Sequence, residues 1–353
     1  VVTATFTVTV TDDEGATATQ DVVITITGAN DAPVITPGVV TGTILEGSTL
    51  TDNGSMTFAD LDLTDRPVAT EATASVTALQ QDGLTALTLS AAQRADIEAA
   101  FTIDDSGNSN DGTVTWDYSI AETALDFLGE GETVTATFTV TVTDDEGATD
   151  TQDVTINITG ANDAPVITNL PTAAAGAVTE DGHLDDGTAV AGTAVATNTL
   201  TATDVDADAT QSWTLQGSPS TTYGTLVLDA ATGVWTYTLD NNLAATQALK
   251  EGETVVETYT ARVTDDFGAY EDQVITITIN GTNDVPVVTN AAAAAAGAVT
   301  EAGHLDDGTA VAGTAVATNT LTATDVDADA TQTLTLIHIS EPTRQESRSR
   351  MPS

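Results

Sequence analysis

Oxygen-bearing side chains recur in one fixed order at three places along this chain. Each place combines an Asn-Asp pair just before a proline, an early glutamate and an Asp-x-Asp pair, and two of the three add an Asp-Asp turn. Carboxylate and amide oxygens are the ligands of calcium, which takes about six to eight of them in flexible geometry. Magnesium prefers a tighter octahedron with retained water, and zinc prefers histidine or cysteine. The pattern therefore predicts Ca2+ as the cofactor.

The candidate metal ligands form three sets, and each set is expected to converge on the Asn-Asp junction that opens its own repeat. The first set is Asn30, Asp31, Glu46, Asp60, Asp62, Asp144 and Asp145. The second set is Asn162, Asp163, Glu180, Asp204, Asp206, Asp265 and Asp266. The third set, which lacks the late turn, is Asn283, Asp284, Glu301, Asp325 and Asp327.

Two other interpretations of possible metal ligands carry less weight. The histidines His183 and His304 occupy equivalent positions in two GHLDDG segments, and one imidazole per repeat predicts a solvated loop residue rather than a ligand. The segment DVDADAT at 204–210 has aspartates at alternate positions, as an EF-hand loop has. However, Ala209 and Leu215 stand where that loop needs glycine and glutamate. We therefore reject an EF-hand.

Strands must position these residues, because apolar and threonine side chains alternate with a period of two. Phe6, Val8 and Val10 share one face of such a segment, with threonines on the other. Acidic turns containing glycine separate the paired strands. The sequence predicts an all-β chain of tandem antiparallel Greek-key β-sandwiches in a linear array. One helix is expected after Ser90, because Gln93 completes the spacing of a capping box.

Long internal repeats define the expected domains. The string VTATFTVTVTDDEGAT occurs at 2–17 and again at 134–149, and residues 174–211 return at 295–332 with one difference. Repeats of this length indicate tandem whole domains. The predicted divisions are a C-terminal hairpin of a truncated repeat at 1–32, complete domains at 33–164 and 165–285, the N-terminal part of another repeat at 286–336, and a foreign tail at 337–353. That tail resembles a translated sequencing adapter, and the chain reads as a piece of a longer protein.

Composition excludes several classes of function. The chain of 353 residues has 7 basic against 53 acidic residues and a formal net charge of −46. Nucleic acid and anionic membranes both require a basic face, so neither is an expected partner. The chain has no cysteine, which excludes disulfides and thiolate metal sites. It also has no apolar run long enough for a membrane-spanning helix.

Two stretches carry a resemblance to a known family. The segment TVTVTDDEGATDTQDVTINITGANDAPVIT at 139–168 resembles the end of a VCBS repeat, a family found in large bacterial surface and secreted proteins. The segment YGTLVLDAATGVWTYTLDNN at 223–242, followed by ALKEGET, is similar to the middle of that repeat. The order of acidic residues also resembles cadherin domains, which are Ig-like β-sandwiches.

The resemblance implies a function as well as a fold. It implies that Glu46, Asp60, Asp62 and Asp144 converge on one linker and bind calcium between domains, with Glu132 and Glu253 as loose matches to a further ligand cluster. It implies a calcium-rigidified stalk of a bacterial adhesin that supports cell adhesion or biofilm formation. The expected partners are neighbouring repeats and, through domains outside this chain, a host or matrix surface. The expected location is the extracellular bacterial surface, reached by type I secretion.

Other functions remain open at this point. We expect no enzyme, because the acidic residues are duplicated in each repeat and no phosphate loop or nucleophile motif occurs. A carbohydrate- or protein-binding repeat, a spacer arm of a secreted enzyme and a spacer without metal are the alternatives. Trp235, Tyr237 and Leu239 share one strand face, which could stack against a sugar. Core packing is the favoured interpretation for them, as for Trp116 and Trp213.

Overall fold

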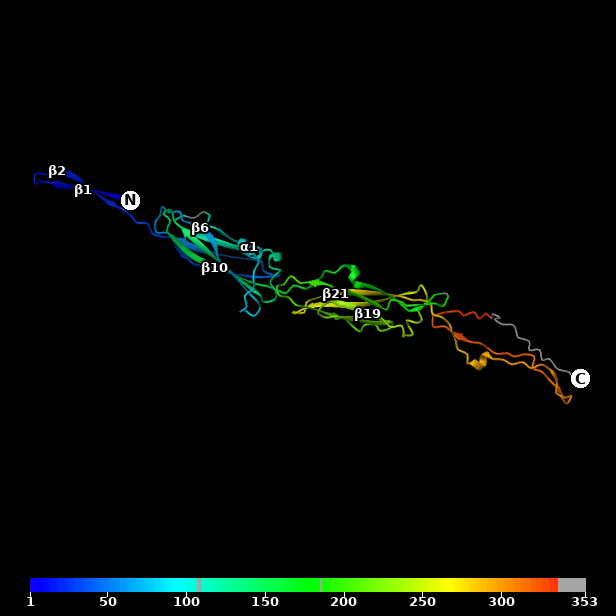
Figure 1. Cartoon of the computed structure of the whole chain (residues 1–353). Coiled ribbons are helices and arrows are strands. Elements are labelled where there is room, and N and C mark those ends of the chain that lie inside the picture. Colours follow the sequence, from blue (N-terminus) through cyan, green and yellow to red (C-terminus); the bar gives the residue numbers. More distant parts are fainter. Residues whose placement is uncertain (107–108, 185, 336–353) are drawn as a thin grey trace. The chain divides into compact units, whose positions relative to one another are not determined.

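The computed structural model describes residues 1–106, 109–184 and 186–335, so the predicted foreign tail at 337–353 lies outside the described residues. Strands dominate this part of the chain (Figure 1), which confirms the all-β fold class. The described residues divide into two compact units. The first unit contains 1–165 together with the loops 204–210 and 265–269, and the second contains 166–203, 211–264 and the described residues from 270 onward.

Two four-stranded sheets form the sandwich of the first unit. One sheet has the order β4 (Thr41–Leu45), β10 (Thr149–Thr159), β9 (Thr133–Thr143) and β6 (Val68–Leu79). The other has the order β3 (Val34–Thr36), β5 (Thr51–Ala59), β8 (Asp111–Ser119) and β7 (Phe101–Asp104). The pairing of β4 with β10 is parallel, whereas the other pairings are antiparallel.

The core of this sandwich follows the predicted alternation. Val134, Phe138 and Val142 on β9 are fully buried, while the threonines between them are partly exposed. Trp116 is also fully buried, and its indole N–H donates to the Val39 carbonyl at 2.7 Å. Trp116 therefore belongs to the core, as expected.

The predicted helix forms as α1 (Ala91–Ala99). The Ser90 side chain accepts from the Gln93 backbone N–H, and the Gln93 side chain accepts from the Ser90 backbone N–H. This capping box satisfies two donors at the start of the helix, and Ile97 is buried against the sandwich. Two short 3₁₀ segments follow along the chain, η1 (Glu122–Ala124) and η2 (Pro171–Ala174), and a third, η3 (Ala292–Ala295), lies further on.

The hairpin of β1 (Val2–Thr11) and β2 (Thr17–Ile26) closely resembles β9 and β10 in sequence, but no second sheet covers it among the described residues. Phe6 is 55% exposed, although the equivalent Phe138 is fully buried. The register within the hairpin is regular, with Phe6 opposite Val22. The alternation of apolar and threonine residues therefore specifies a strand, but the apolar face of that strand is buried only where a second sheet packs against it.

The second unit repeats the sandwich with two long strands and several shorter ones. One sheet has the order β12 (Ala175–Thr179), β21 (Tyr270–Asn280), β20 (Thr254–Asp265) and β17 (Gln211–Leu215), and β12 again pairs in parallel, with β21. The other has the order β15 (Val195–Thr199), β19 (Val234–Leu239) and β18 (Gly224–Leu228). Two small pairs complete it: β11 (Val166–Ile167) with β16 (Ala202–Thr203), and β13 (Gly182–His183) with β14 (Ala189–Val190).

Aromatic residues fill the core of the second unit. Trp235 and Tyr237 are fully buried, and Trp213 is nearly so. The Trp235 indole N–H donates to the Ala173 carbonyl at 2.8 Å. The favoured interpretation of these residues as core is confirmed, and the strand face that carries Trp235 offers no exposed ring for a sugar.

Residues 286–335 contain small elements that match the start of the preceding repeat. β22 (Val287–Val288) pairs with β25 (Ala323–Thr324), and β23 (Gly303–His304) pairs with β24 (Ala310–Val311). Most of their side chains are exposed. Within the described part of the chain, no helix has the length and apolar character needed to cross a membrane.

Candidate metal centre

The early glutamate and the Asp-Asp turn lie at opposite ends of the same sandwich. Leu45 at the end of β4 lies opposite Thr159 at the end of β10, so Glu46 follows directly beside the next Asn-Asp junction. Its carboxylate accepts a hydrogen bond from the Ala161 backbone N–H at 2.9 Å. Asp144 precedes β10, and the length of that strand separates the two carboxylates by about 30 Å. The expected convergence of Glu46 with Asp31, Asp60, Asp62 and Asp144 is therefore wrong.

The same shift by one junction occurs in the next repeat. Thr179 lies opposite Asn280, which places Glu180 beside the third junction rather than beside Asn162 and Asp163. The Glu180 carboxylate accepts from the Thr282 backbone N–H at 3.4 Å and from the Gln247 amide at 3.3 Å. The physical reason is the parallel pairing of β4 with β10 and of β12 with β21, which carries the early glutamate to the far end of the sandwich.

Glu301 is the third early glutamate, and it is exposed. The described residues 286–335 contain no strand equivalent to β10 or β21 with which its segment could pair. Glu301 therefore does not join Asn283, Asp284, Asp325 and Asp327, and its place in the third set is also a wrong expectation.

Two other parts of each predicted set, the Asn-Asp junction and the Asp-x-Asp pair, do come together. At every junction, the second carboxylate of the Asp-x-Asp pair accepts a hydrogen bond from the backbone N–H of the junction aspartate. The pairs are Asp62 with Asp31 at 2.8 Å, Asp206 with Asp163 at 2.9 Å, and Asp327 with Asp284 at 2.9 Å. The first aspartate of each pair accepts from the backbone of the second; these are Asp60, Asp204 and Asp325. One hydrogen-bond pattern thus recurs three times.

The late turns join two of the junctions through asparagine. The Asn30 amide donates to Asp144 at 2.8 Å, and the Asn162 amide donates to Asp265 at 3.1 Å. The other oxygen of Asp144 accepts from the backbone of Glu146 and Ala148, which closes the turn. The hydrogen bond from Asn30 is the main cause of a lowered pKa for Asp144. The second aspartates of the two turns, Asp145 and Asp266, are exposed.

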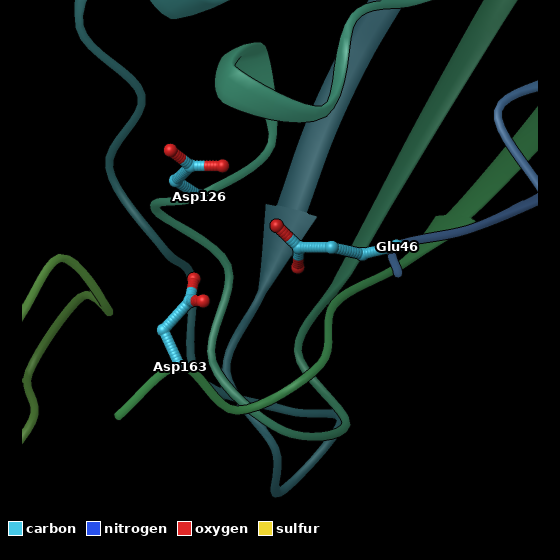
Figure 2. Close-up of side chains that lie close together, drawn as sticks. All are labelled: Glu46, Asp126 and Asp163. Atoms are coloured by element: carbon cyan, nitrogen blue, oxygen red, sulfur yellow. The ribbon is translucent and has the colours of Figure 1, made fainter. Parts of the chain in front are cut away.

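Sequence patterns missed an acidic residue at the second junction. Carboxylate oxygens of Glu46, Asp126 and Asp163 lie within 4.8 Å of one another. These carboxyl groups approach from three separate segments (Figure 2). Asp126 follows η1 and lies outside every repeated motif, since the equivalent position five residues before the next Gly-Glu-Thr is Gln247. No sequence signal within this chain singled it out.

The sequence patterns also missed two acidic residues at the first junction, Asp65 and Glu146. Oxygens of Asp60, Asp62 and Asp65 lie within 4.8 Å of one another, and so do those of Asp65, Asp144 and Glu146. Asp65 is only 4% exposed. It lies three residues beyond the Asp-x-Asp pair in DLDLTD, a spacing that could have drawn attention to it.

The loosely matched Glu132 and Glu253 have local partners. Glu132 is buried and accepts from the Gly129 backbone N–H at 3.2 Å. Glu253 accepts from the Lys250 backbone N–H at 3.4 Å. Both contacts close the turn before the long strand that follows. Neither residue is part of a described group of three carboxylates close enough to share an ion.

Several buried carboxylate oxygens have no hydrogen-bond partner within the described residues. They are Asp60 Oδ2 and Asp65 Oδ2 at the first junction, Glu46 Oε1, Asp204 Oδ2 and Asp206 Oδ1 at the second, and Asp284 Oδ2 and Asp327 Oδ1 at the third. A buried anionic oxygen without a partner is costly unless a cation neutralises it. A set of oxygen donors alone, carrying several negative charges, fits calcium better than a softer metal.

The electrostatics of these junctions agree with that fit. Burial raises the pKa of Glu46 to about 7, and the negative charges of Asp163, Glu122 and Asp206 contribute to the rise. Burial and the negative charges of Asp284, Asp327 and Asp181 raise the pKa of Glu180 to about 7 as well. Burial likewise raises the pKa of Asp206 to about 6. The folded chain therefore resists full ionisation of these clusters when no counterion is bound.

Comparison with known proteins bears on the second repeat. Residues 162–281 match the family model of a bacterial cadherin-like domain. No curated protein matches the chain. This match supports the cadherin part of the predicted resemblance, whereas the VCBS resemblance remains a prediction.

Solved cadherin structures are also similar to the chain. Protocadherin gamma B7 extracellular cadherin domains 1–4 match at 15% identity, over 78% of this chain and 58% of that chain, with a TM-score of 0.36. The protocadherin gamma B4 extracellular domain matches at 15% identity over 92% and 46%, with a TM-score of 0.38. Human CDH23 EC21-23 matches at 15% identity over 82% and 83%, with a TM-score of 0.36.

Proposed function

We propose that the chain is an array of adhesion-type, extracellular repeat modules whose junctions bind calcium. The observation that carries the proposal is at the second junction. Glu46 Oε1 and Asp206 Oδ1 are buried and unpartnered within the described residues, and their companion oxygens both accept from the linker, at Ala161 and Asp163. Glu46 belongs to the repeat before the linker and Asp206 to the one after it. Carboxylates of successive repeats thus contact the same short stretch of chain.

The mechanism follows from charge. Without a cation, the carboxylates around a junction repel one another and resist ionisation, which favours a loosened linker. When bound, calcium supplies the positive charge that the clustered oxygens lack. Glu46, Asp126, Asp163, Asp204 and Asp206 are the residues that would hold it at the second junction. The linker is then held from both sides, so that neighbouring repeats keep a fixed relation.

The stability that calcium adds to a junction can be estimated from the calcium affinity of extracellular modules. Such modules bind calcium at about 10⁻⁴–10⁻³ M. At a hundredfold excess over the dissociation constant, one site adds about 2.7 kcal/mol of stability. That is a large share of the roughly 5–15 kcal/mol by which a domain is stable. Calcium binding can then stabilise this cysteine-free chain, as disulfides stabilise other extracellular proteins.

We extend the proposal to the wider setting. The modules serve as a non-enzymatic stalk of a secreted or surface-anchored bacterial adhesin, active in cell adhesion or biofilm formation and exported by type I secretion. The match to a bacterial cadherin-like domain supports a structural repeat of this kind. The recurrence of one hydrogen-bond pattern at three junctions supports a structural rather than catalytic use of the carboxylates.

Calcium titration of the whole chain by calorimetry tests the proposal. We expect saturable binding, with weaker binding in the Asp206→Asn variant, which removes one of the negative charges at the second junction. Glu71→Gln is a matched control, because Glu71 lies exposed on β6 away from the Asn-Asp junctions. An isotherm without calcium binding, or equal losses in both variants, would contradict the proposal.

A further inference from the structure

Asp65 at the first junction is a buried carboxylate that no described basic group neutralises. It is only 4% exposed, and its Oδ2 has no hydrogen-bond partner within the described residues. Arg66 is the next residue, but its guanidinium donates to the backbone carbonyls of Leu63 and Asp65. No ion pair in the described part of the chain involves the Asp65 carboxylate. A buried anionic oxygen in this state is costly unless a cation binds it.

The Asp65 carboxylate belongs to two groups of ligand atoms. Oxygens of Asp65, Asp60 and Asp62 lie within 4.8 Å of one another, and so do oxygens of Asp65, Asp144 and Glu146. The five residues do not form one group with separations this short. Oxygens on opposite sides of a calcium ion are about 5 Å apart, twice the usual bond length. The arrangement therefore fits two ions that share Asp65 better than one ion bound by all five residues.

Hydrogen bonds hold Asp144 in position for the second of these groups. Its Oδ1 accepts from the backbone N–H groups of Glu146 and Ala148, at 3.0 and 2.8 Å. Its Oδ2 accepts from the Asn30 amide at 2.8 Å. Because a carboxylate oxygen has two lone pairs, Asp144 Oδ2 can accept this bond and still bind a cation.

A hollow at the first junction gives an ion access to these carboxylates. Its volume is about 260 Å³, and Asn30, Asp62, Asp65 and Glu146 are among the residues that line it. Glu146 is exposed, so an ion can enter from solvent. Each water molecule occupies about 30 Å³ in the liquid, so the hollow has room for a calcium ion with several waters. Such waters complete the six to eight oxygens that calcium takes.

The second junction lacks both of the residues that distinguish this site. Counted from the Asp-x-Asp pair, the equivalent of Asp65 is Ala209, and counted from the late turn, the equivalent of Glu146 is Phe267. Ala209 and Phe267 line a common hollow, so the two positions are neighbours at this junction as well. Both carboxylates are thus present together at the first junction and absent together at the second. Neither belongs to the motif that recurs at every junction.

We propose that the first junction binds two calcium ions that share Asp65 as a ligand. Asp60 and Asp62 hold one ion with it, and Asp144 and Glu146 hold the other. The inference rests on the proposed function, because it adds a second ion to one of the calcium-binding junctions. That ion links the loop between β5 and β6 to the turn between β9 and β10, a link for which the second junction has no ligands.

Counting the bound calcium by equilibrium dialysis of the whole chain tests the proposal. The free calcium concentration is varied across the roughly 10⁻⁴–10⁻³ M range of extracellular modules. We expect Glu146→Gln to weaken one bound ion by at least about tenfold, the range seen even for residues that only support a metal ligand. Asp65→Asn should weaken two ions, because it removes the shared charge. Equal calcium counts in the parent chain and in Glu146→Gln would overturn the proposal, as would the loss of a single ion in Asp65→Asn.

Glu14→Gln is the matched control, because Glu14 lies in an identical TDDEGAT turn at 11–17 and is exposed. It should leave every bound ion unchanged, and a loss equal to that in Glu146→Gln would contradict the proposal. A parent chain that binds no calcium would contradict the proposed function and this inference together. Calcium binding by the parent that Glu146→Gln does not disturb would contradict the inference alone.

Hydrogen exchange separates the loss of an ion from misfolding. In chelator, the parent and Glu146→Gln should show equal protection of the core strands. In calcium, the parent should gain protection in the turn at 144–148, and Glu146→Gln should lose most of this gain. The equivalent turn at 12–16 should gain none in either chain. A gain at 144–148 that Glu146→Gln retains in full would contradict the second ion.

Discussion

Glu46 and Ala161 are 115 residues apart in sequence, yet the Glu46 carboxylate accepts a 2.9 Å hydrogen bond from the Ala161 backbone N–H. This contact joins the end of β4, an early strand of the repeat, to the linker that follows its last strand. The parallel pairing of β4 with β10 produces it. Each complete repeat therefore contributes its early glutamate to the junction after it, and its Asp-x-Asp pair to the junction before it.

Replacing Glu46 by glutamine should weaken calcium binding while stabilising the metal-free fold. The amide keeps the shape and an acceptor for Ala161 but removes a buried charge that lacks a second partner among the described residues. The cost of such a group is about 1–3 kcal/mol, so the metal-free chain should gain up to that amount at a pH where Glu46 is ionised. Calorimetry and denaturant unfolding measure the two effects.

Glu301→Gln is the control for that variant, because Glu301 holds the equivalent sequence position and is exposed. It should change neither calcium binding nor stability. An equal effect of both substitutions would show that charge number, rather than the position of Glu46, matters.

The metal-free chain should lose stability as the pH rises from about 4.5 to about 7. The pKa of Glu46 and that of Glu180 are raised from an ordinary 4.5 to about 7 in the folded chain. Between these values the folded state binds more protons than the unfolded state, so the free energy of unfolding falls with pH. Denaturant unfolding in chelator at several pH values measures this slope.

The double variant Glu46→Gln, Glu180→Gln should flatten this pH dependence. Saturating calcium should flatten it as well, because calcium favours the ionised carboxylates. A slope that persists unchanged in the double variant would assign the effect to other groups.

Replacing Gly182 by alanine should destabilise the third junction, because the added methyl group would collide with Thr282. Overpacking of this kind costs about 1–3 kcal/mol. Gly303→Ala should be neutral, since open space surrounds that position in the described structure. Hydrogen exchange of the linker amides near Asn283 compares the two, and equal protection in both variants would contradict the docked position of β13.

Replacing Trp235 by alanine should unfold or strongly weaken the second sandwich. The side chain is fully buried and its indole N–H is hydrogen-bonded to Ala173. Loss of a core tryptophan costs about 3–5 kcal/mol. Denaturant unfolding measures this cost. A stable variant that had lost only glycan binding would instead favour a carbohydrate-binding repeat.

Local patterns predicted the strands and much of each junction. The alternation in 134–143 predicted the buried face of β9, and the Asn-Asp and Asp-x-Asp motifs predicted pairs such as Asp163 with Asp206. The placement of Glu46 could not be predicted locally, because it depends on a parallel pairing between distant strands. Asp126 was missed because its counterpart in the next repeat is Gln247, so the repeat comparison that found the other ligands passed over it.

The distance between two repeats, measured by electron paramagnetic resonance, tests the central claim most directly. The chain has no cysteine, so spin labels can be attached at Leu84→Cys and Val227→Cys, two exposed positions in different repeats. We predict a narrow distribution of label distances in calcium and a broad one in chelator, with the broad distribution retained in calcium by a variant lacking the Glu46 and Asp206 carboxylates. The same distribution in calcium and in chelator would contradict the claim that calcium fixes the relation between neighbouring repeats.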